Sequence, residues 1–466
     1  MSGQFIRPAH GEVLCPPAIM KLRYVVISTI AAAAAIGSVG ADRLTARGRV
    51  TLPTAHRLSP AEQLRQRDLQ IAGWGKALDA DSASAIALGQ LAGLYLQRGR
   101  ESGNYEDFTR AELLANKSLS FRENRNGKSF VTLASSLLAQ HRFAEARAAA
   151  KTVVELEPDI PQYRALLGET QLELGDYDGA RASFASLYPR RTHLSIAPRL
   201  ARFAEISGRT VEARRLLTVA RDAALARTDL PPEQIAWFHL RLGEVEARAG
   251  RPRSARANFS RGLLIAPDDY RLLGALARLE NAQGNPRKGA ELAERSLAER
   301  MDPATLGTLS EAYEILGDTA RAGEAFRAME VSVTAQPGAY HRAWSLFLLD
   351  HNRRIPKVLE KAREEITTRK DIYGYDLLAW ALFKQGLYAE ARQAARQALR
   401  LGTEDASLYY HAGMIERALG DYAVARDYLE RTLTINGDFD PIQARLAREA
   451  LESLESLESL ESLPDE

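Results

Sequence analysis

Apolar residues recur at helical spacing along most of this chain, in short segments that come in pairs. Within residues 161–194, Leu166 and Leu174 lie on one helical stripe, and Ala180 and Phe184 lie on a second. The segments contain no alternating apolar and polar run of the kind that forms a half-buried strand. Each pair is therefore predicted to form a helical hairpin, and the fold class is predicted to be all-α.

A Gly-Asp pair separates the two helices of this hairpin. Gly175 suits the position just past a helix end, and Asp176 can accept hydrogen bonds from the N–H groups that begin the next helix. The same pair recurs at residues 317–318 and 420–421. Glycine within the first helix costs about 1 kcal/mol relative to alanine, so it predicts a close approach of two helices. Such glycines are Gly168, Gly243 and Gly413.

The turn glycines recur at a nearly constant interval along the chain. They are Gly175, Gly208, Gly250, Gly284, Gly317, Gly386 and Gly420, and an alanine stands five positions after each except Gly284. The gap before Gly386 is about double the usual interval and is interpreted as two units, with the missing turn near His351 and Asn352, because asparagine also tolerates the left-handed conformation. The longer step before Gly250 is interpreted as one unit plus a lengthened loop within residues 221–232.

These units resemble tetratricopeptide repeats, whose pattern has Leu-Gly and an aromatic residue in the first helix and Ala, an aromatic residue, Ala and Pro in the second. The residues that carry the resemblance are His239, Leu242, Gly243, Ala255, Phe259 and Pro267 in one unit, Gly413, Tyr422, Ala425 and Leu429 in another, and Ala134, Phe143, Ala146, Ala150 and Pro158 in a third. The resemblance, to the bacterial exported or membrane-anchored type, covers residues 82–439 and is weakest at residues 337–371. It implies a right-handed α-solenoid of about nine to ten hairpins.

A solenoid requires a cap at each end that covers the apolar face of the last hairpin. Residues 59–81 begin with a capping box, Ser-Pro-Ala-Glu, and are predicted to form the N-terminal capping helix. Residues 440–450 begin with Asp-Pro and are predicted to form the C-terminal one. Residues 451–466 repeat Leu-Glu-Ser with period three, which gives no lasting helical stripe, and are interpreted as a low-complexity tail.

Residues 1–41 are predicted to be an N-terminal extension followed by a signal peptide or a membrane anchor. Lys21 and Arg23 precede an uncharged segment, residues 24–40, whose apolar core is residues 25–36. A core of that length is typical of a signal peptide, and the flanking small residues extend it just far enough for an uncleaved anchor. The chain is expected to be periplasmic or secreted, or attached to the inner membrane through residues 24–41, with translation from Met1 or from Met20. Residues 42–58 are interpreted as a linker.

Composition and charge exclude several classes of protein. The 466 residues include 45% apolar and 26% charged residues, as in soluble globular proteins, which argues against wholesale disorder or a polytopic membrane protein. The 62 Lys and Arg nearly balance the 60 Asp and Glu, so no nucleic-acid partner is expected. The single cysteine, Cys15, excludes an intramolecular disulfide and a thiolate metal site. We expect no metal and no cofactor.

The sequence contains no complete phosphate-binding loop, zinc motif or nucleophile elbow. Residues 127–129 read Gly-Lys-Ser, but the glycine that a phosphate-binding loop needs five positions earlier is Arg122. Neither a His-Glu-x-x-His zinc motif nor a Gly-x-Ser-x-Gly elbow occurs. His239 and His411 fall on first helices, where a packed or surface histidine is the commoner outcome. The chain is therefore not expected to be an enzyme.

The resemblance implies that a protein or peptide binds in a groove lined by the first helices. The family's groove positions carried over to this chain, together with the preference of binding hot spots for aromatic residues and Arg, select ten candidate partner-binding residues. They are Trp237, Arg271, Arg278, Tyr373, Asp376, Trp380, Phe383, Tyr410, Met414 and Arg417. The alternative for each residue is ordinary packing between helices, because an error of one position in the register turns a groove residue inward.

Two other functions compete with a peptide-binding scaffold. The chain could be a structural or assembly component of a cell-envelope complex, of the pilus or polysaccharide export type. More remotely, the solenoid could be the accessory domain of an enzyme whose active site is not recognised.

Overall fold

The computed structural model describes residues 60–334 and 342–461. All described residues belong to one compact unit. The predicted leader, residues 1–41, and the predicted linker, residues 42–58, lie outside the described residues.

The described residues form 22 α-helices and one short 3-10 helix, η1, and contain no strand. The helices are α1 (Pro60–Ala80), α2 (Ala85–Ser102), α3 (Tyr105–Phe121), α4 (Gly127–Ala139), α5 (Phe143–Leu156), α6 (Pro161–Glu173), α7 (Tyr177–Ala185), η1 (Tyr188–Arg190), α8 (Ala197–Ile206), α9 (Thr210–Leu225), α10 (Pro232–Arg248), α11 (Pro252–Ile265), α12 (Tyr270–Ala282), α13 (Pro286–Glu299), α14 (Pro303–Ile315), α15 (Thr319–Thr334), α16 (Arg342–Asp350), α17 (Ile355–Glu365), α18 (Ile372–Lys384), α19 (Tyr388–Leu399), α20 (Ala406–Ala418), α21 (Tyr422–Ile435) and α22 (Gln443–Glu461).

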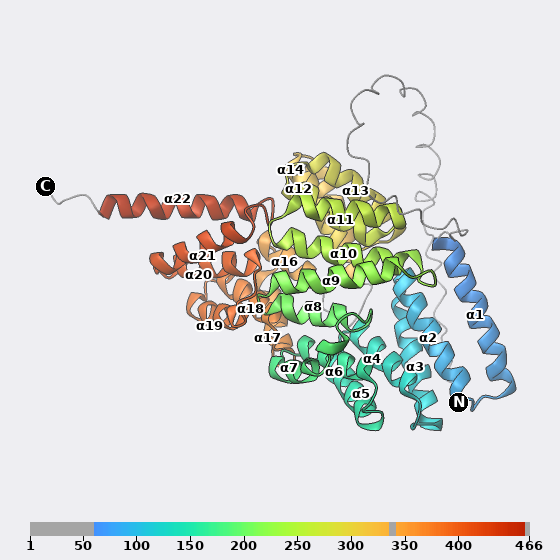
Figure 1. Cartoon of the computed structure of the whole chain (residues 1–466). Coiled ribbons are helices and arrows are strands. Elements are labelled where there is room, and N and C mark those ends of the chain that lie inside the picture. Colours follow the sequence, from blue (N-terminus) through green and yellow to red (C-terminus); the bar gives the residue numbers. More distant parts are fainter. Residues whose placement is uncertain (1–59, 335–341, 462–466) are drawn as a thin grey trace, which may run out of the picture. The chain divides into compact units, whose positions relative to one another are not determined.

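Helices α2 to α21 form ten successive hairpins, each an even-numbered first helix packed against the odd-numbered second helix that follows it. Each hairpin also packs against the next one along the chain (Figure 1). Helix α1 covers α2 at one end, and α22 packs against α20 and α21 at the other. The predicted all-α solenoid is confirmed.

The tight turns inside the hairpins have the predicted conformation. Gly175 has a φ of 75°, and its N–H donates to the carbonyl of Leu172 at 3.0 Å. Asp176 then caps α7, because its side chain accepts a hydrogen bond from the Gly179 N–H at 3.0 Å. Asn352, at the turn that lacks a glycine, also takes the left-handed conformation with a φ of 53°, as predicted.

The glycines inside first helices mark close contacts within a hairpin. A Cβ atom on Gly168 would lie 2.5 Å from a ring carbon of Phe184, and one on Gly413 would lie 2.9 Å from Leu429. Two real carbon atoms do not approach so closely, so any larger residue would push the two helices apart. The predicted reason for these glycines is confirmed.

Two boundaries differ from the sequence prediction. The extra residues before Gly250 were expected in a loop, but α9 continues to Leu225 and α10 already begins at Pro232, so the two helices have 16 and 17 residues. Most of the extra length is therefore helical. Helix α22 runs to Glu461, well beyond the expected end at residue 450, because Leu and Glu favour helix even without a lasting apolar stripe. Leu454 is buried against the last hairpins.

The solenoid also turns back on itself, so that the turns of early hairpins touch loops of much later ones. At the first junction, a Cβ on Gly175 would collide with the carbonyl oxygen of Lys370. The Lys370 N–H donates to the carbonyl of Leu174 at 3.2 Å, and the Ile372 N–H donates to the Tyr177 hydroxyl at 2.8 Å.

Two more junctions repeat this arrangement along the chain. At the second, Gly208 meets Gly402, and the Thr403 hydroxyl donates to the carbonyl of Ile206. At the third, the Asn436 side-chain amide donates to the carbonyl of Ala247 at 2.9 Å, beside Gly250. An ideal solenoid is stabilised by contacts between neighbouring repeats alone. These three junctions add a second set of contacts, between hairpins that lie far apart in the sequence.

Candidate functional site

The first helices form one layer of the solenoid, because consecutive members from α10 to α20 contact one another. The layer bends until helices of distant hairpins face each other. The guanidinium of Arg202 on α8 lies over the ring of Tyr373 on α18, 5.3 Å from its centroid. We call the side of the first helices that carries Arg202 and Tyr373 the inner face.

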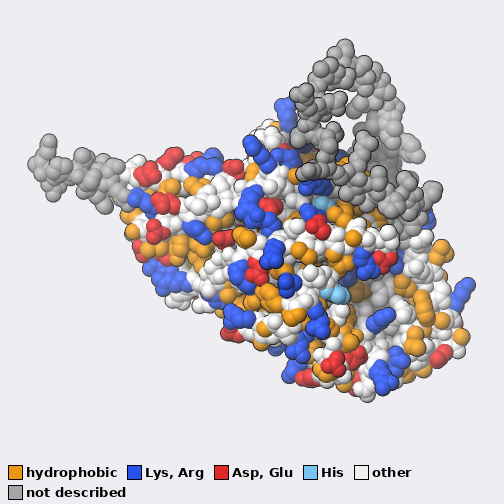
Figure 2. Space-filling model, viewed as in Figure 1, with side chains coloured by type: hydrophobic (Ala, Val, Ile, Leu, Met, Phe, Trp, Pro, Cys, Tyr) orange, Lys and Arg blue, Asp and Glu red, His pale blue; other side chains and the backbone are white. Residues whose placement is uncertain are grey.

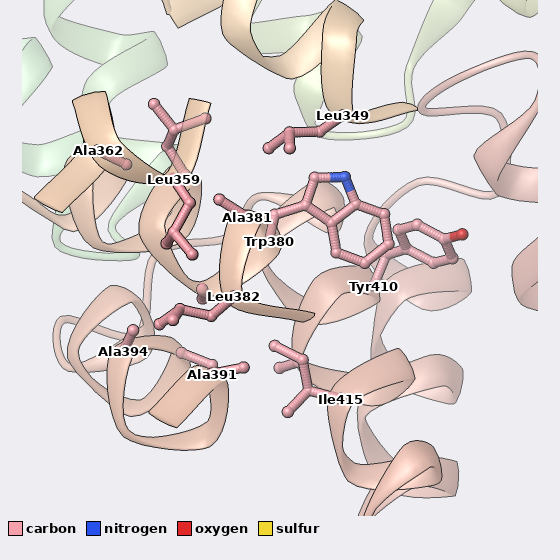
Figure 3. Packing of buried hydrophobic residues seen from close by; sticks show 14 of the residues in the cluster. Leu349, Leu359, Ala362, Trp380, Ala381, Leu382, Ala391, Ala394, Tyr410 and Ile415 are labelled. Atoms are coloured by element: carbon pink, nitrogen blue, oxygen red, sulfur yellow. The ribbon is translucent and has the colours of Figure 1, made fainter. Parts of the chain in front are cut away.

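Two of the predicted groove aromatics are core residues in this structure. Trp380 and Tyr410 are each only 2% exposed. Trp380 stacks on Phe383 and on His411, with centroid distances of 4.8 and 4.2 Å. Figure 3 shows Trp380 and Tyr410 side by side among aliphatic side chains. Their side chains hold α16, α18 and α20 together and leave little surface for a partner.

Asp376, another predicted groove residue, is also buried, at 1% exposed. It accepts a hydrogen bond from His411 Nδ1 at 2.7 Å and another from Arg342 at 2.9 Å. Burial raises the pKa of a carboxyl group, but His411 and Arg342 outweigh it and hold the pKa of Asp376 below its usual value. The interaction joins three successive first helices, so Asp376 has a packing role here.

The remaining seven predicted residues keep some exposure. Trp237, Arg271, Tyr373, Phe383, Met414 and Arg417 are half-buried, and Arg278 is exposed. Two of the arginines are engaged within the chain: Arg271 pairs with Asp269, the N-cap of its own helix, at 2.5 Å, and Arg417 donates to Ser453 of α22 at 3.1 Å. Arg278 has no hydrogen bond or ion pair to another described residue.

Sequence reasoning missed a basic cluster on the inner face of α8 and α10. Glu205 accepts ion pairs from Arg202 at 3.2 Å, from Arg241 at 3.4 Å and from Arg248. Burial would raise the pKa of Glu205, but these three guanidinium groups outweigh it and lower the pKa to about 2. Arg202, Arg241 and Arg248 are not among the ten candidate residues, of which only Trp237 lies on α10.

An acidic cluster lies farther along the inner face, formed by Glu311 of α14, Asp350 of α16 and Asp440 before α22. Burial is the largest cause that raises the pKa of all three carboxyl groups, and the charges of Asp350 and Asp440 raise the pKa of Glu311 further. Asp350 accepts hydrogen bonds from Trp380 Nε1 and from Gln443 Nε2, both at 2.8 Å. No hydrogen bond or ion pair joins Glu311 to another described residue. The raised pKa values favour the protonated form of these carboxyl groups, although Arg278 acts against the shift at Glu311 and Lys384 acts against it at Asp350. An added cation would favour their ionised form.

Within residues 60–334 and 342–461, no group of three or more His, Cys, Asp or Glu side chains is placed to hold a metal ion. Over the same residues, none of the helices combines the length and the apolar character that a membrane span requires.

The tetratricopeptide repeat family model matches residues 131–193 and 377–441. These two segments, about a quarter of the chain, are similar to tetratricopeptide repeats. The first match covers most of α4 and all of α5, α6, α7 and η1, and the second covers the end of α18 and all of α19, α20 and α21. Tetratricopeptide repeats are units of protein-interaction scaffolds, and the second match includes the first helix α20 and part of the first helix α18.

Solved structures with similar repeats include yeast Tom70, at 12% identity over 86% of this chain and 95% of that one, with a TM-score of 0.34. The Cut9-Hcn1 hetero-tetramer of the APC/C has 13% identity over 84% and 94%, with a TM-score of 0.33. PilW, a type IV pilus biogenesis factor, has 18% identity over 48% and 99%, with a TM-score of 0.38. These low values carry no information about a partner. A search of curated proteins found no match.

Proposed function

We propose that this chain is a non-catalytic scaffold whose inner face binds a protein or peptide segment with a basic side chain next to an apolar one. The observation that supports this most is the acidic cluster beside half-buried apolar groups. Phe383 stacks on Trp380, which donates to Asp350 of the cluster. Met414 lies one helical turn after Tyr410, whose pKa is raised by burial and by Asp350 and Asp440.

A partner's Lys or Arg would relieve the electrostatic cost of the acidic cluster. Glu311, Asp350 and Asp440 repel one another in a poorly solvated setting, and an opposite charge within a few ångströms favours the ionised form of each. The apolar surface of Phe383 and Met414 would supply the contact that a charge pair alone does not, since aromatic residues dominate binding hot spots. Because the hairpins already hold this surface, binding would require little ordering of the scaffold.

Site-specific photo-crosslinking tests the location of the partner. Benzoylphenylalanine placed at Phe383 should crosslink a partner in cells, whereas the same group at Val211, which is 72% exposed on a second helix, should not. Crosslinking from Val211 alone would contradict the proposal. Crosslinks to a large envelope complex would identify the chain as an assembly component of that complex.

The crosslinked segment, made as a peptide, then tests the chemistry. Glu311→Gln should weaken its binding at least fivefold, because one carboxylate of the acidic cluster is lost. Glu360→Gln is the matched control, since Glu360 is exposed on α17 and has no ion pair among the described residues. Equal binding by the unaltered chain, Glu311→Gln and Glu360→Gln would show that the acidic cluster is not part of the binding site.

We also propose that residues 20–41 direct the chain to export, so that it works in the periplasm, outside the cell or on the inner membrane. Fractionation together with the mass of the mature N-terminus tests this. A chain that begins near residue 42 fits cleavage, and an intact chain in the membrane fraction fits an anchor. A full-length chain in the cytosol would contradict the proposal.

A further inference from the structure

A pocket of about 360 Å³ lies on the second-helix side of the solenoid, between α9 and α11 with α10 as its floor. Arg214 and Arg221 line it from α9, and Arg253 and Arg261 line it from α11. We call it the outer pocket. Figure 2 shows Lys and Arg side chains on the face of the molecule that includes these helices. Small-ligand sites begin at about 300 Å³, so the pocket is large enough for a small ligand.

The positive charge of the outer pocket is only partly balanced. Its one carboxylate, Glu246, contacts Arg214 at 3.2 Å and is shared with Arg251 at 3.3 Å. Arg221 pairs with Asp222 at 2.7 Å. Arg253 and Arg261 form no hydrogen bond or ion pair with any other described residue. Arg253 and Arg261 are exposed to solvent. The four guanidinium groups around this open pocket therefore have fewer anionic partners than they could use, and like charges so placed repel one another.

Buried polar atoms in the outer pocket also lack partners. Arg214 Nη2 is buried and donates to no atom in the described part of the chain. Asn258 is only 8% exposed, and its amide nitrogen donates to the Ser254 carbonyl at 2.9 Å. Its Oδ1 interacts with the nearby His239 ring but accepts no hydrogen bond of good geometry in the described part of the chain. A buried donor or acceptor without a partner costs about 1 to 3 kcal/mol. A ligand that supplied both an acceptor and a donor would remove that cost.

The pKa of His239, on the floor helix α10, is also affected by arginines of the outer pocket. Burial and the charges of Arg221 and Arg261 lower the pKa of His239 to about 4, so the imidazole stays neutral at pH 7. His239 therefore adds no positive charge to α10, whose charged contribution to the pocket is the single carboxylate of Glu246.

We propose that the outer pocket binds a phosphate group, free or at the end of a small phosphate ester. Planar guanidinium groups match the oxygen geometry of phosphate and bind it through paired, charge-assisted hydrogen bonds. Thr218 and Ser254, which also line the pocket, add hydroxyl donors of the kind that phosphate sites use. A phosphate that keeps one proton can in addition donate to Asn258 Oδ1. Sulfate has no such proton near pH 7 and is expected to bind more weakly.

Isothermal titration calorimetry on the full chain at fixed ionic strength tests the proposal, with inorganic phosphate, glycerol 1-phosphate and sulfate as probes. We expect one phosphate or phosphate ester per chain, and sulfate at least fivefold weaker. Tighter binding of glycerol 1-phosphate would indicate an ester as ligand, and tighter binding of inorganic phosphate would indicate the free ion. No saturable binding of either would overturn the proposal.

Arg261→Gln should weaken phosphate binding at least tenfold. Arg215→Gln is the matched control, because Arg215 is an exposed arginine of α9 that does not line the outer pocket, and it should bind phosphate within twofold of the unaltered chain. Arg261 has no described partner to lose, so both variants should melt at the temperature of the unaltered chain, which separates lost binding from lost folding. Equal weakening by both variants would show a diffuse charge effect and overturn the proposal.

Discussion

The hairpin turns of the early and late parts of the solenoid share one backbone conformation but have different surroundings. Turn glycines in both parts have φ between 66° and 81°. A methyl group on an early one would strike the backbone of a distant loop, whereas nothing lies within 4 Å of that position on a late one. The early set is Gly175, Gly208 and Gly250, and the late set is Gly317, Gly386 and Gly420.

This difference separates two roles that look identical in the sequence. In the late hairpins, glycine is needed only because the turn requires a left-handed residue. In the early hairpins, it also allows the backbone of a later loop to approach. Substitutions at the two sets should therefore differ in cost by the contribution of the junction.

The largest expected effect is that of Gly175→Ala. The left-handed conformation costs alanine about 1 kcal/mol or more, and the new methyl group also forces Lys370 away. The hydrogen bonds at Lys370 and Ile372 would be lost with it, at about 1 kcal/mol each. We expect a loss of about 3 to 4 kcal/mol in the free energy of unfolding, measured by urea denaturation. A loss of free energy no larger than that for a substitution at a late turn would contradict a stabilising role of the first junction.

The second-largest loss of stability is expected for Arg369→Met, because Arg369 joins both sides of the first junction. It contacts Glu173 at 3.1 Å and Glu365 at 3.3 Å, and it pairs with Asp371. Removing it leaves three partly buried carboxylates without their shared cation, and we expect a loss of about 2 to 3 kcal/mol by urea denaturation. Arg363→Met, an exposed arginine of α17 paired only with Glu390, should cost less than about 1 kcal/mol.

The first junction should also make stability depend on pH. Burial raises the pKa of Glu365 to about 7 despite the opposing effect of Arg369. An unfolded glutamate titrates near 4.3, so between about pH 4.5 and pH 7 the folded chain holds more protons than the unfolded chain. Stability contributed by Glu365 is therefore present at low pH and lost as the pH rises through 7. Glu365→Gln should raise stability at pH 8 by about 1 to 2 kcal/mol. Melting curves of both chains at pH 5 and pH 8 test this, and parallel pH profiles would contradict it.

The smallest expected effect is that of Gly386→Ala, which sharpens the comparison with Gly175. Only the left-handed strain remains at this turn, so the free energy of unfolding should fall by about 1 kcal/mol. The same urea denaturation measures it. A loss as large as that of Gly175→Ala would mean that both turns carry only local strain.

What could be predicted from the sequence was confined to single hairpins. The regular spacing of glycines and alanines reflects contacts that every unit repeats within itself, such as the contact of Gly168 with Phe184. The left-handed conformation of Asn352 could be predicted because asparagine tolerates it. The three junctions could not be predicted from the sequence, because they depend on small rotations between hairpins that add up over several units. Lys370 and Asn436 lie in loops and carry no pattern that marks them.

The inner face shows the same limit. The candidate positions carry the family's spacing over to this chain, and a shift of one position decides whether a side chain is available to a partner. Trp380 and Tyr410 are buried because neighbouring first helices pack closely around them, whereas Arg241 and Arg248, which were not candidates, pair with Glu205 on the inner face. A repeat pattern specifies which helix faces inward and leaves the rotation of that helix to packing.

Hydrogen exchange at residues 369–373 tests most directly whether the solenoid turns back on itself. The Lys370 and Ile372 amides precede or begin α18, so within their own hairpin they have no carbonyl partner, and the bonds to Leu174 and Tyr177 are their protection. We predict slow exchange of both amides in the unaltered chain and fast exchange in Gly175→Ala. Fast exchange in the unaltered chain, at the rate of an exposed loop, would contradict the account.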